Sequence, residues 1–258
     1  MPIDFHAVDN RYTYASRSAD PAWADAIRAL VDPVGKRVAD VGCGGGIYAL
    51  AWQGLGAAQV TGVDFSAGMV AAARERAAGI EGLRFVQGDA AATGLPAGGC
   101  DVVFARALIH HLPAYGACFA EARRLLAPGG LLLVQDRTPE DVNLPGSAEH
   151  FRGYFFDRFP RLRAIEAGRR PTPETVSAAL QAAGFTGTTR TTLWETRKTY
   201  AGFEPLAADL AVRTGRSILH ELDDDELQAL IGYIRSQLPA QGPIVEKDRW
   251  TLWSARAA

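Results

Sequence analysis

The sequence predicts an α/β fold with a doubly wound, mostly parallel sheet. A short apolar run, Arg37–Val41, breaks into a glycine-rich turn and resumes as Ile47–Leu50 with helical spacing. That order of strand, turn and helix is typical of the start of a βαβ nucleotide-binding unit. Four further apolar runs of strand length follow, in alternation with helical patterns. Such alternation favours parallel strands joined by crossover helices.

Composition restricts the possible classes of protein. The chain has 258 residues, of which 48% are hydrophobic, enough for a sizeable core in one decorated domain. A net charge of -2 argues against a nucleic-acid partner. The three cysteines lie far apart without metal-ligand spacing, which predicts no metal site and fits the reducing cytoplasm. No signal peptide or membrane-spanning apolar run is visible, so we expect no membrane association.

Local signals place the first elements. Asp20 followed by Pro21 predicts a helix start, because aspartate caps helices and proline suits the first helical position. Gln59–Asp64 has the composition of a second strand. Ser66 then predicts the N-cap of a helix over Ala67–Ala78.

The next strands are expected at Leu83–Asp89, Cys100–Arg106 and Leu131–Gln135. Tyr115–Leu126 is amphipathic with helical spacing and stops before a Pro-Gly-Gly turn. The fifth of these expected strands therefore ends close to residue 136.

The last part of the chain is less regular. Asn143–Arg170 is rich in aromatic residues and arginine but has little clean periodicity. Phe185–Tyr200 and Ile244–Ala255 read as two long strands. Phe203–Leu238 reads as helical, with acids in a first turn where the helix dipole favours them. We therefore expect the sheet to finish with two strands separated by a helical insertion.

The glycine turn indicates which ligand it could hold. A dinucleotide fingerprint needs a third glycine or an alanine where this chain has Ile47, and no phosphate-loop pattern occurs. Asp64 ends a strand about twenty residues beyond the turn, where a ribose-binding acid belongs. A carboxylate there can accept hydrogen bonds from both ribose hydroxyls. The alternative is a strand-to-helix turn that holds no ligand.

Five stretches together resemble the class I S-adenosylmethionine-dependent methyltransferases. Asp40-Val41-Gly42-Cys43-Gly44 is similar to the D-x-G-x-G signature of that family. VTGVDFS, FVQGDAAA, DVVFARALIHHLP and RRLLAPGGLLLVQD are similar to its later motifs, in order, over about the first 137 residues. The resemblance implies a seven-stranded Rossmann-like sheet with an antiparallel last strand. It also implies S-adenosyl-L-methionine as the cofactor and methyl transfer as the reaction.

The resemblance also implies a set of cofactor contacts. Phe65 and Met69 would sandwich adenine, although each could equally belong to the core. Asp89 and the backbone amide of Ala90 would recognise the adenine edge. An N-terminal flap would bring Arg17 to the cofactor carboxylate, the alternative being a surface tail. The expected cofactor-binding residues are Tyr14, Arg17, Asp40, Gly42, Gly44, Asp64, Phe65, Met69, Asp89, Ala90 and Arg106.

We expect one methyltransferase domain with cap segments. The expected core comprises residues 20–137, 171–200 and 243–258, and the expected caps comprise residues 1–19, 138–170 and 201–242. The caps would lie over the strand ends, and their aromatic and arginine side chains would suit the walls of an acceptor pocket. The alternative is extra helix that covers core without touching substrate.

The loop after the fourth strand carries the candidates for proton transfer. His110 and His111 are near-neutral bases, and Asp136 ends the neighbouring strand, where it could orient one of them. A base is needed only if the acceptor atom must lose a proton. The alternative is that both histidines are structural.

The expected function is methylation of a small, partly apolar acceptor at oxygen or nitrogen. Two other classes stay open: a protein that binds the cofactor without transferring methyl, and a nicotinamide-dependent oxidoreductase. The sequence predicts neither the acceptor nor the oligomeric state.

Overall fold

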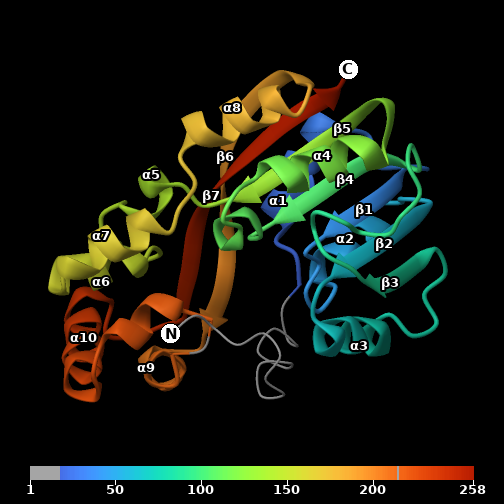
Figure 1. Ribbon diagram of the computed structural model, residues 1–258. Helices are drawn as coiled ribbons and strands as arrows, with labels where there is room; N and C mark the ends of the chain where they lie inside the picture. The colour runs from blue at the N-terminus through green and yellow to red at the C-terminus, as the bar shows by residue number, and fades with distance from the viewer. Residues whose placement is uncertain (1–17, 214) are drawn as a thin grey trace. The chain divides into compact units, whose positions relative to one another are not determined.

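The seven-stranded sheet of the computed structural model, which describes residues 18–213 and 215–258, has the order β3-β2-β1-β4-β5-β7-β6 (Figure 1). The strands are β1 (Arg37–Val41), β2 (Gln59–Asp64), β3 (Leu83–Gln87), β4 (Cys100–Arg106), β5 (Leu126–Asp136), β6 (Phe185–Tyr200) and β7 (Ile244–Ala257). β1 to β5 pair in parallel, whereas β7 runs antiparallel to β5. This confirms the predicted fold class, including the antiparallel last strand.

Helices connect the strands. They are α1 (Pro21–Leu30), α2 (Ile47–Gly54), α3 (Ala67–Arg76), α4 (Gly116–Leu125), α5 (Pro139–Val142), α6 (Arg152–Arg158), α7 (Arg161–Gly168), α8 (Pro173–Ala182), α9 (Phe203–Ala211) and α10 (Asp224–Gln237), with short 3₁₀ turns η2 (Ile109–His111) and η3 (Ser217–Glu221). The predicted caps are confirmed. Asp20 and Ser66 each accept a backbone N–H of the first turn of their helix. Asp223, predicted only as one of the acids of a first turn, caps α10 in the same way.

Several predicted boundaries differ from the structure. β3 ends two residues before Asp89, because Asp89 turns the chain by accepting the backbone N–H groups of Ala91 and Ala92. β5 begins at Leu126 instead of Leu131. The insertion Phe203–Leu238 comprises two α-helices with a 3₁₀ turn between them.

The described chain divides into two compact units. We call residues 18–136, 171–193 and 251–258 the sheet unit, and residues 137–170, 194–213 and 215–250 the helical unit. β6 and β7 each contribute residues to both units. The helical unit corresponds closely to the two described segments expected to form caps. A single domain whose caps cover the strand ends stays a prediction.

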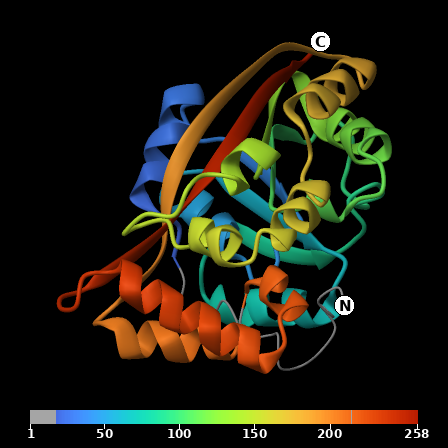
Figure 2. The same cartoon turned by 90° about the vertical axis from the view of Figure 1, so that its left-hand side faces the viewer.

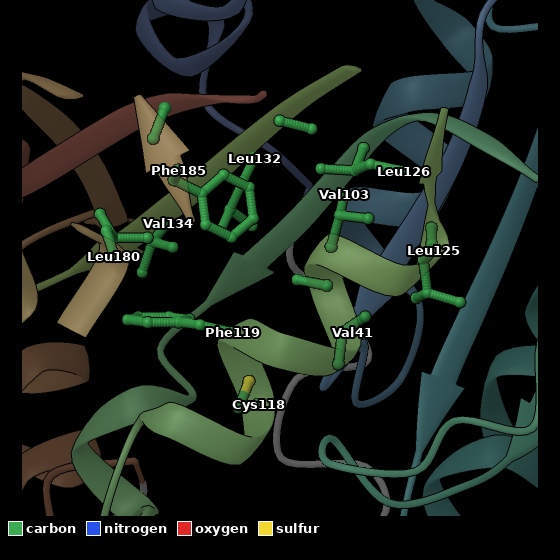
Figure 3. Close-up of a cluster of buried hydrophobic side chains, with 14 of the residues drawn as sticks. Val41, Val103, Cys118, Phe119, Leu125, Leu126, Leu132, Val134, Leu180 and Phe185 are labelled. Carbon is green, nitrogen blue, oxygen red and sulfur yellow. The ribbon is translucent and has the colours of Figure 1, made fainter. Parts of the chain in front are cut away.

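One face of the sheet packs against α4 and α8. Val103 of β4, Phe119 of α4 and Leu180 of α8 are buried in one hydrophobic cluster (Figure 3). The next residue of β4, Phe104, points to the opposite face, as strand geometry requires. There it packs against Trp23 of α1, with ring centroids 5.7 Å apart. The sheet is therefore covered on both faces, as expected of parallel strands.

The helical unit has a core of its own. α9 and α10 lie side by side in Figure 2 and pack with α6 around buried aromatic and aliphatic side chains. Phe151, Phe155 and Phe156 are among these buried side chains. The Asn143–Arg170 segment therefore forms helices α6 and α7, which its weak periodicity did not predict. These three aromatics build the unit's core, so they do not support the expected acceptor-pocket walls.

Buried ion pairs also hold the helical unit together. Glu166 lies 3.0 Å from Nη1 of Arg152 and 2.5 Å from Nη2 of Arg170. Glu246 lies 2.6 Å from Nη2 of Arg216. Removing one partner of such a buried pair is strongly destabilising, because the other charge stays in a site of low dielectric.

Candidate active site

The site lies at the carboxyl ends of β1, β2 and β4. The strand order reverses between β1 and β4, and such a switch point is where open α/β sheets bind ligands. All the residues described below belong to the sheet unit. Their arrangement therefore does not depend on the helical unit.

Asp64 organises the glycine turn. One carboxylate oxygen accepts the backbone N–H of Gly44 at 2.8 Å, and the other accepts that of Ser66 at 2.9 Å. The N–H groups of Gly42 and Cys43 both donate to the carbonyl of Val63, at 2.8 and 3.0 Å. The acid at the end of β2 thus connects the glycine turn to the start of α3.

Gly42 lies against the loop that follows β4. Its φ of +76° is unfavourable for other residues, and a Cβ there would lie 2.9 Å from a methyl carbon of Leu108. Ala107, just before Leu108, has a φ of +51° and donates its N–H to the carbonyl of Gln135 at 2.8 Å. A left-handed alanine stores backbone strain, which is typical of functional loops.

A buried acid and an arginine lie beside the turn. Burial, and then the charge of Asp64, raises the pKa of Asp40 to about 7, whereas the charge of Arg106 lowers it. Arg106 lies over the ring of Tyr48, 4.3 Å from its centroid. One Asp40 oxygen, Oδ2, is buried without a hydrogen-bond partner among the described residues. This oxygen is a natural acceptor for a ligand N–H group.

The expected adenine contacts surround the start of α3. Phe65 is 48% exposed, so its ring is accessible for stacking, whereas Met69 is only 5% exposed and packs in the core. The side-chain amide of Gln87 donates to the carbonyl of Phe65 at 2.9 Å. Asp89 is exposed on the turn that follows β3. The hydrogen bond from Gln87 holds the backbone of Phe65 at the end of β3. Asp89 follows two residues after Gln87 in the sequence.

His110 and Asp136 form a pair. Nδ1 of His110 lies 2.9 Å from both carboxylate oxygens of Asp136, and the backbone N–H of His110 donates to Oδ2 at 3.3 Å. The His111 side chain is more exposed, and its ring centroid lies 3.9 Å from that of His110. With its proton on Nδ1, toward the carboxylate, His110 keeps Nε2 as a basic nitrogen.

Tyr14 and Arg17 lie outside the described residues, so the flap stays a prediction. Among residues 18–213 and 215–258, no group of three or more metal-ligating side chains could hold an ion. Within the same ranges, every helix is too short or too polar to span a lipid bilayer.

Sequence reasoning missed two residues of the site. Tyr48 supports Arg106, and Leu108 packs against Gly42. Tyr48 is the second residue of the helix that follows the glycine turn, which was the only signal in the sequence. Nothing in the sequence distinguished Leu108 from other apolar loop residues.

A glycine turn ordered by a strand-end acid, at the switch point of an open α/β sheet, is typical of proteins that bind a nucleotide-like cofactor. Comparison with known proteins agrees. Residues 39–134 match the family model described as a methyltransferase domain. Demethylmenaquinone methyltransferase of Thermus thermophilus is 31% identical over 202 residues, covering 70% of this chain and 90% of that protein. The chain therefore belongs to the class I S-adenosylmethionine-dependent methyltransferases and uses that cofactor.

Other relatives match over shorter stretches. Ubiquinone biosynthesis O-methyltransferase of Xanthomonas axonopodis is 32% identical over 52% of this chain and 60% of its own length. Trans-aconitate 2-methyltransferase of an Acidovorax strain is 32% identical over 51% of this chain, which spans about half (49%) of that relative. The family membership supports methyl transfer over the two alternative classes.

Solved structures show the same fold. Phosphoethanolamine N-methyltransferase 2 of Haemonchus contortus, solved with S-adenosyl-L-methionine, has a TM-score of 0.59 at 17% identity, over 98% of this chain and 60% of that one. A methyltransferase of Mesorhizobium loti has a TM-score of 0.52 at 21% identity, over 91% and 97% of the two chains.

Proposed function

We propose that this methyltransferase methylates a small, partly apolar acceptor at oxygen or nitrogen, with His110 as the general base when the acceptor is a hydroxyl. The observation that carries the proposal is the contact between His110 and Asp136 at the ligand-binding edge of the sheet. We further propose that it works in the cytoplasm and binds neither nucleic acid nor membranes.

The residues present fit the cofactor. Asp64 would accept hydrogen bonds from the ribose hydroxyls, and the unpartnered oxygen of Asp40 would accept one from the ammonium group. Gly42 and Gly44 keep the turn free of side chains, so that the methionine portion can approach the backbone. Phe65, Asp89 and the Ala90 amide would hold the adenine. Met69 and Arg106 would pack beside the bound cofactor. Tyr14 and Arg17 would close over it.

The bound cofactor supplies an electrophilic methyl group. The protein's own contribution is orientation and proton removal. Asp136 holds the His110 proton on Nδ1, so Nε2 can accept the proton of an acceptor hydroxyl. Asp136 then stabilises the imidazolium by its charge. An amine that is already neutral needs no such base, so with that acceptor the pair would only orient the loop.

Relatives support a small acceptor. Their names refer to demethylmenaquinone, to the biosynthesis of ubiquinone and to trans-aconitate, and each of these three compounds is a small molecule. The net charge of -2 leaves little electrostatic attraction for a polyanion.

The test is an acceptor screen. The full chain is incubated with methyl-labelled S-adenosylmethionine and separate pools of phenols, aliphatic alcohols, carboxylates and amines, and label is sought in the pools by mass spectrometry. Enzyme-dependent label on oxygen or nitrogen supports the proposal. Label on carbon alone, or on a protein or RNA in preference to every pool, contradicts it.

A further inference from the structure

The turn that carries Asp89 is held at both of its ends. At its start, the N–H of Gly88 donates to the carbonyl of Asp64 at 3.0 Å. Thr93 lies at the far end of the turn. A Cβ added to Gly88 would lie only 2.8 Å from the carbonyl oxygen of Thr93, which shows that the two ends of the turn are in contact. The geometry of Asp89 and Ala90 therefore depends on what holds Thr93.

Glu121 of α4 holds Thr93. One oxygen of its buried carboxylate, Oε1, accepts the backbone N–H of Thr93 at 2.8 Å and the hydroxyl of Thr93 at 2.5 Å. Arg124 donates to both Glu121 oxygens at 2.7 Å and to the carbonyl of Leu95 at 2.7 Å. A helix carboxylate and a helix guanidinium thus bind the backbone of the turn at two points.

Glu121 is ionised over the whole physiological range. The hydrogen bonds from Arg124, followed by those from Thr93, lower the pKa of Glu121 to about 2 against the opposing effect of burial. Charge-assisted hydrogen bonds are roughly twice as strong as neutral ones.

We propose that Glu121 is a positioning residue, which fixes the Asp89–Ala90 turn in the geometry that recognises the adenine of the cofactor. The inference rests on the proposed placement of adenine at this turn. Glu121 itself touches neither the cofactor nor the acceptor in this proposal. It acts through Thr93.

The test compares two ligands that differ only in the base. The base of S-adenosylhomocysteine carries an amino group, from which the Asp89 carboxylate can accept a hydrogen bond. The base of S-inosylhomocysteine carries a carbonyl oxygen at that position, which has no hydrogen to donate. Calorimetry gives the ratio of their dissociation constants for the full chain. We expect this preference for adenine to fall about tenfold in Glu121→Gln and in Thr93→Val, the equivalent of one hydrogen bond. Thr93→Ser keeps the hydroxyl and should keep the preference.

The chain offers a matched control at the opposite end of the strands. Asp101 accepts the backbone N–H of Arg37 at 2.8 Å and its guanidinium at 3.1 and 2.8 Å. Asp101→Asn should lower the melting temperature but leave the preference for adenine unchanged. The inference is overturned if Glu121→Gln lowers the melting temperature and keeps the wild-type preference, as this control does.

Asp89→Ala separates the inference from the proposal beneath it. Loss of the adenine preference in Asp89→Ala but not in Glu121→Gln would refute only the positioning role. An unchanged preference in Asp89→Ala would refute the adenine placement and the inference together.

Discussion

Nδ1 of His110 lies 2.9 Å from each carboxylate oxygen of Asp136, although the two residues are 26 positions apart in sequence. The Asp136 side chain is fully buried, whereas 15% of the His110 side chain is exposed. Asp136 is also fixed by the sheet, since it pairs with Thr251 of the antiparallel strand β7. A rigid, buried carboxylate therefore orients an imidazole that can still reach a ligand.

Asp136→Asn should test the orientation of the imidazole. The amide can donate its N–H to Nδ1, which favours the proton on Nε2 and removes the base. We expect methyl transfer to a hydroxyl acceptor to fall by roughly 10²–10⁴, the scale of general-base assistance. His111→Ala is the matched control and should stay within a few-fold of wild type. Equal losses in both variants would show that the loop, and not the pair, matters.

Asp64→Ala should weaken the binding of the cofactor by a few kcal/mol, because each hydrogen bond to a charged group contributes about 1.5–3 kcal/mol. It should also destabilise the protein without ligand, since Gly44 and Ser66 lose their acceptor. Calorimetry with S-adenosylhomocysteine and thermal unfolding measure the two effects. Unchanged cofactor affinity would refute the ribose assignment.

The ionisation of Asp40 should make the stability of the folded protein depend on pH. Its folded pKa of about 7 lies above the ordinary value of 3.8, so between these pH values the folded state binds more protons than the unfolded state. Its contribution to the free energy of unfolding should therefore fall as pH rises, by up to about 1.4 kcal/mol per pH unit. Denaturant unfolding of wild type and Asp40→Asn from pH 4 to pH 7 checks this. Parallel curves for the two proteins would show that Asp40 does not titrate in this window.

Gly42→Ala should destabilise the protein by more than Gly44→Ala does. Both glycines have positive φ, but an added Cβ meets Leu108 at position 42 and nothing within 4 Å at position 44. We expect a difference of about 1–3 kcal/mol, the usual cost of overpacking. Leu108→Ala should partly rescue Gly42→Ala in a double-mutant cycle. Additive effects in that cycle would contradict the contact.

Much of the sheet unit could be predicted because its signals are local. Caps such as Asp20 and Ser66 act within three residues, and the spacing of Asp64 from the glycine turn follows from one βαβ unit. The sequence could not choose between His110 and His111, because that choice depends on a contact with a distant strand. Glu121 had no signal for the same reason, since its partner Thr93 is 28 positions away.

The helical unit was harder to predict for a different reason. α6 and α7 are short, and residues such as Arg152 and Glu166 are buried as ion pairs. Buried charges remove the alternation of apolar and polar residues on which helical periodicity depends. The long strands β6 and β7 were recognisable from their β-branched and aromatic residues.

The most direct test of the proposed mechanism is single-turnover methyl transfer by His110→Ala. Enzyme saturated with labelled S-adenosylmethionine is mixed with a hydroxyl acceptor from the screen, and the cofactor dissociation constant is measured alongside. If His110 is the general base, the variant should show a transfer rate lower by roughly 10²–10⁴, an unchanged cofactor affinity and partial rescue by added imidazole. A rate within a few-fold of wild type, or a loss matched by an equal loss of cofactor affinity, would contradict it.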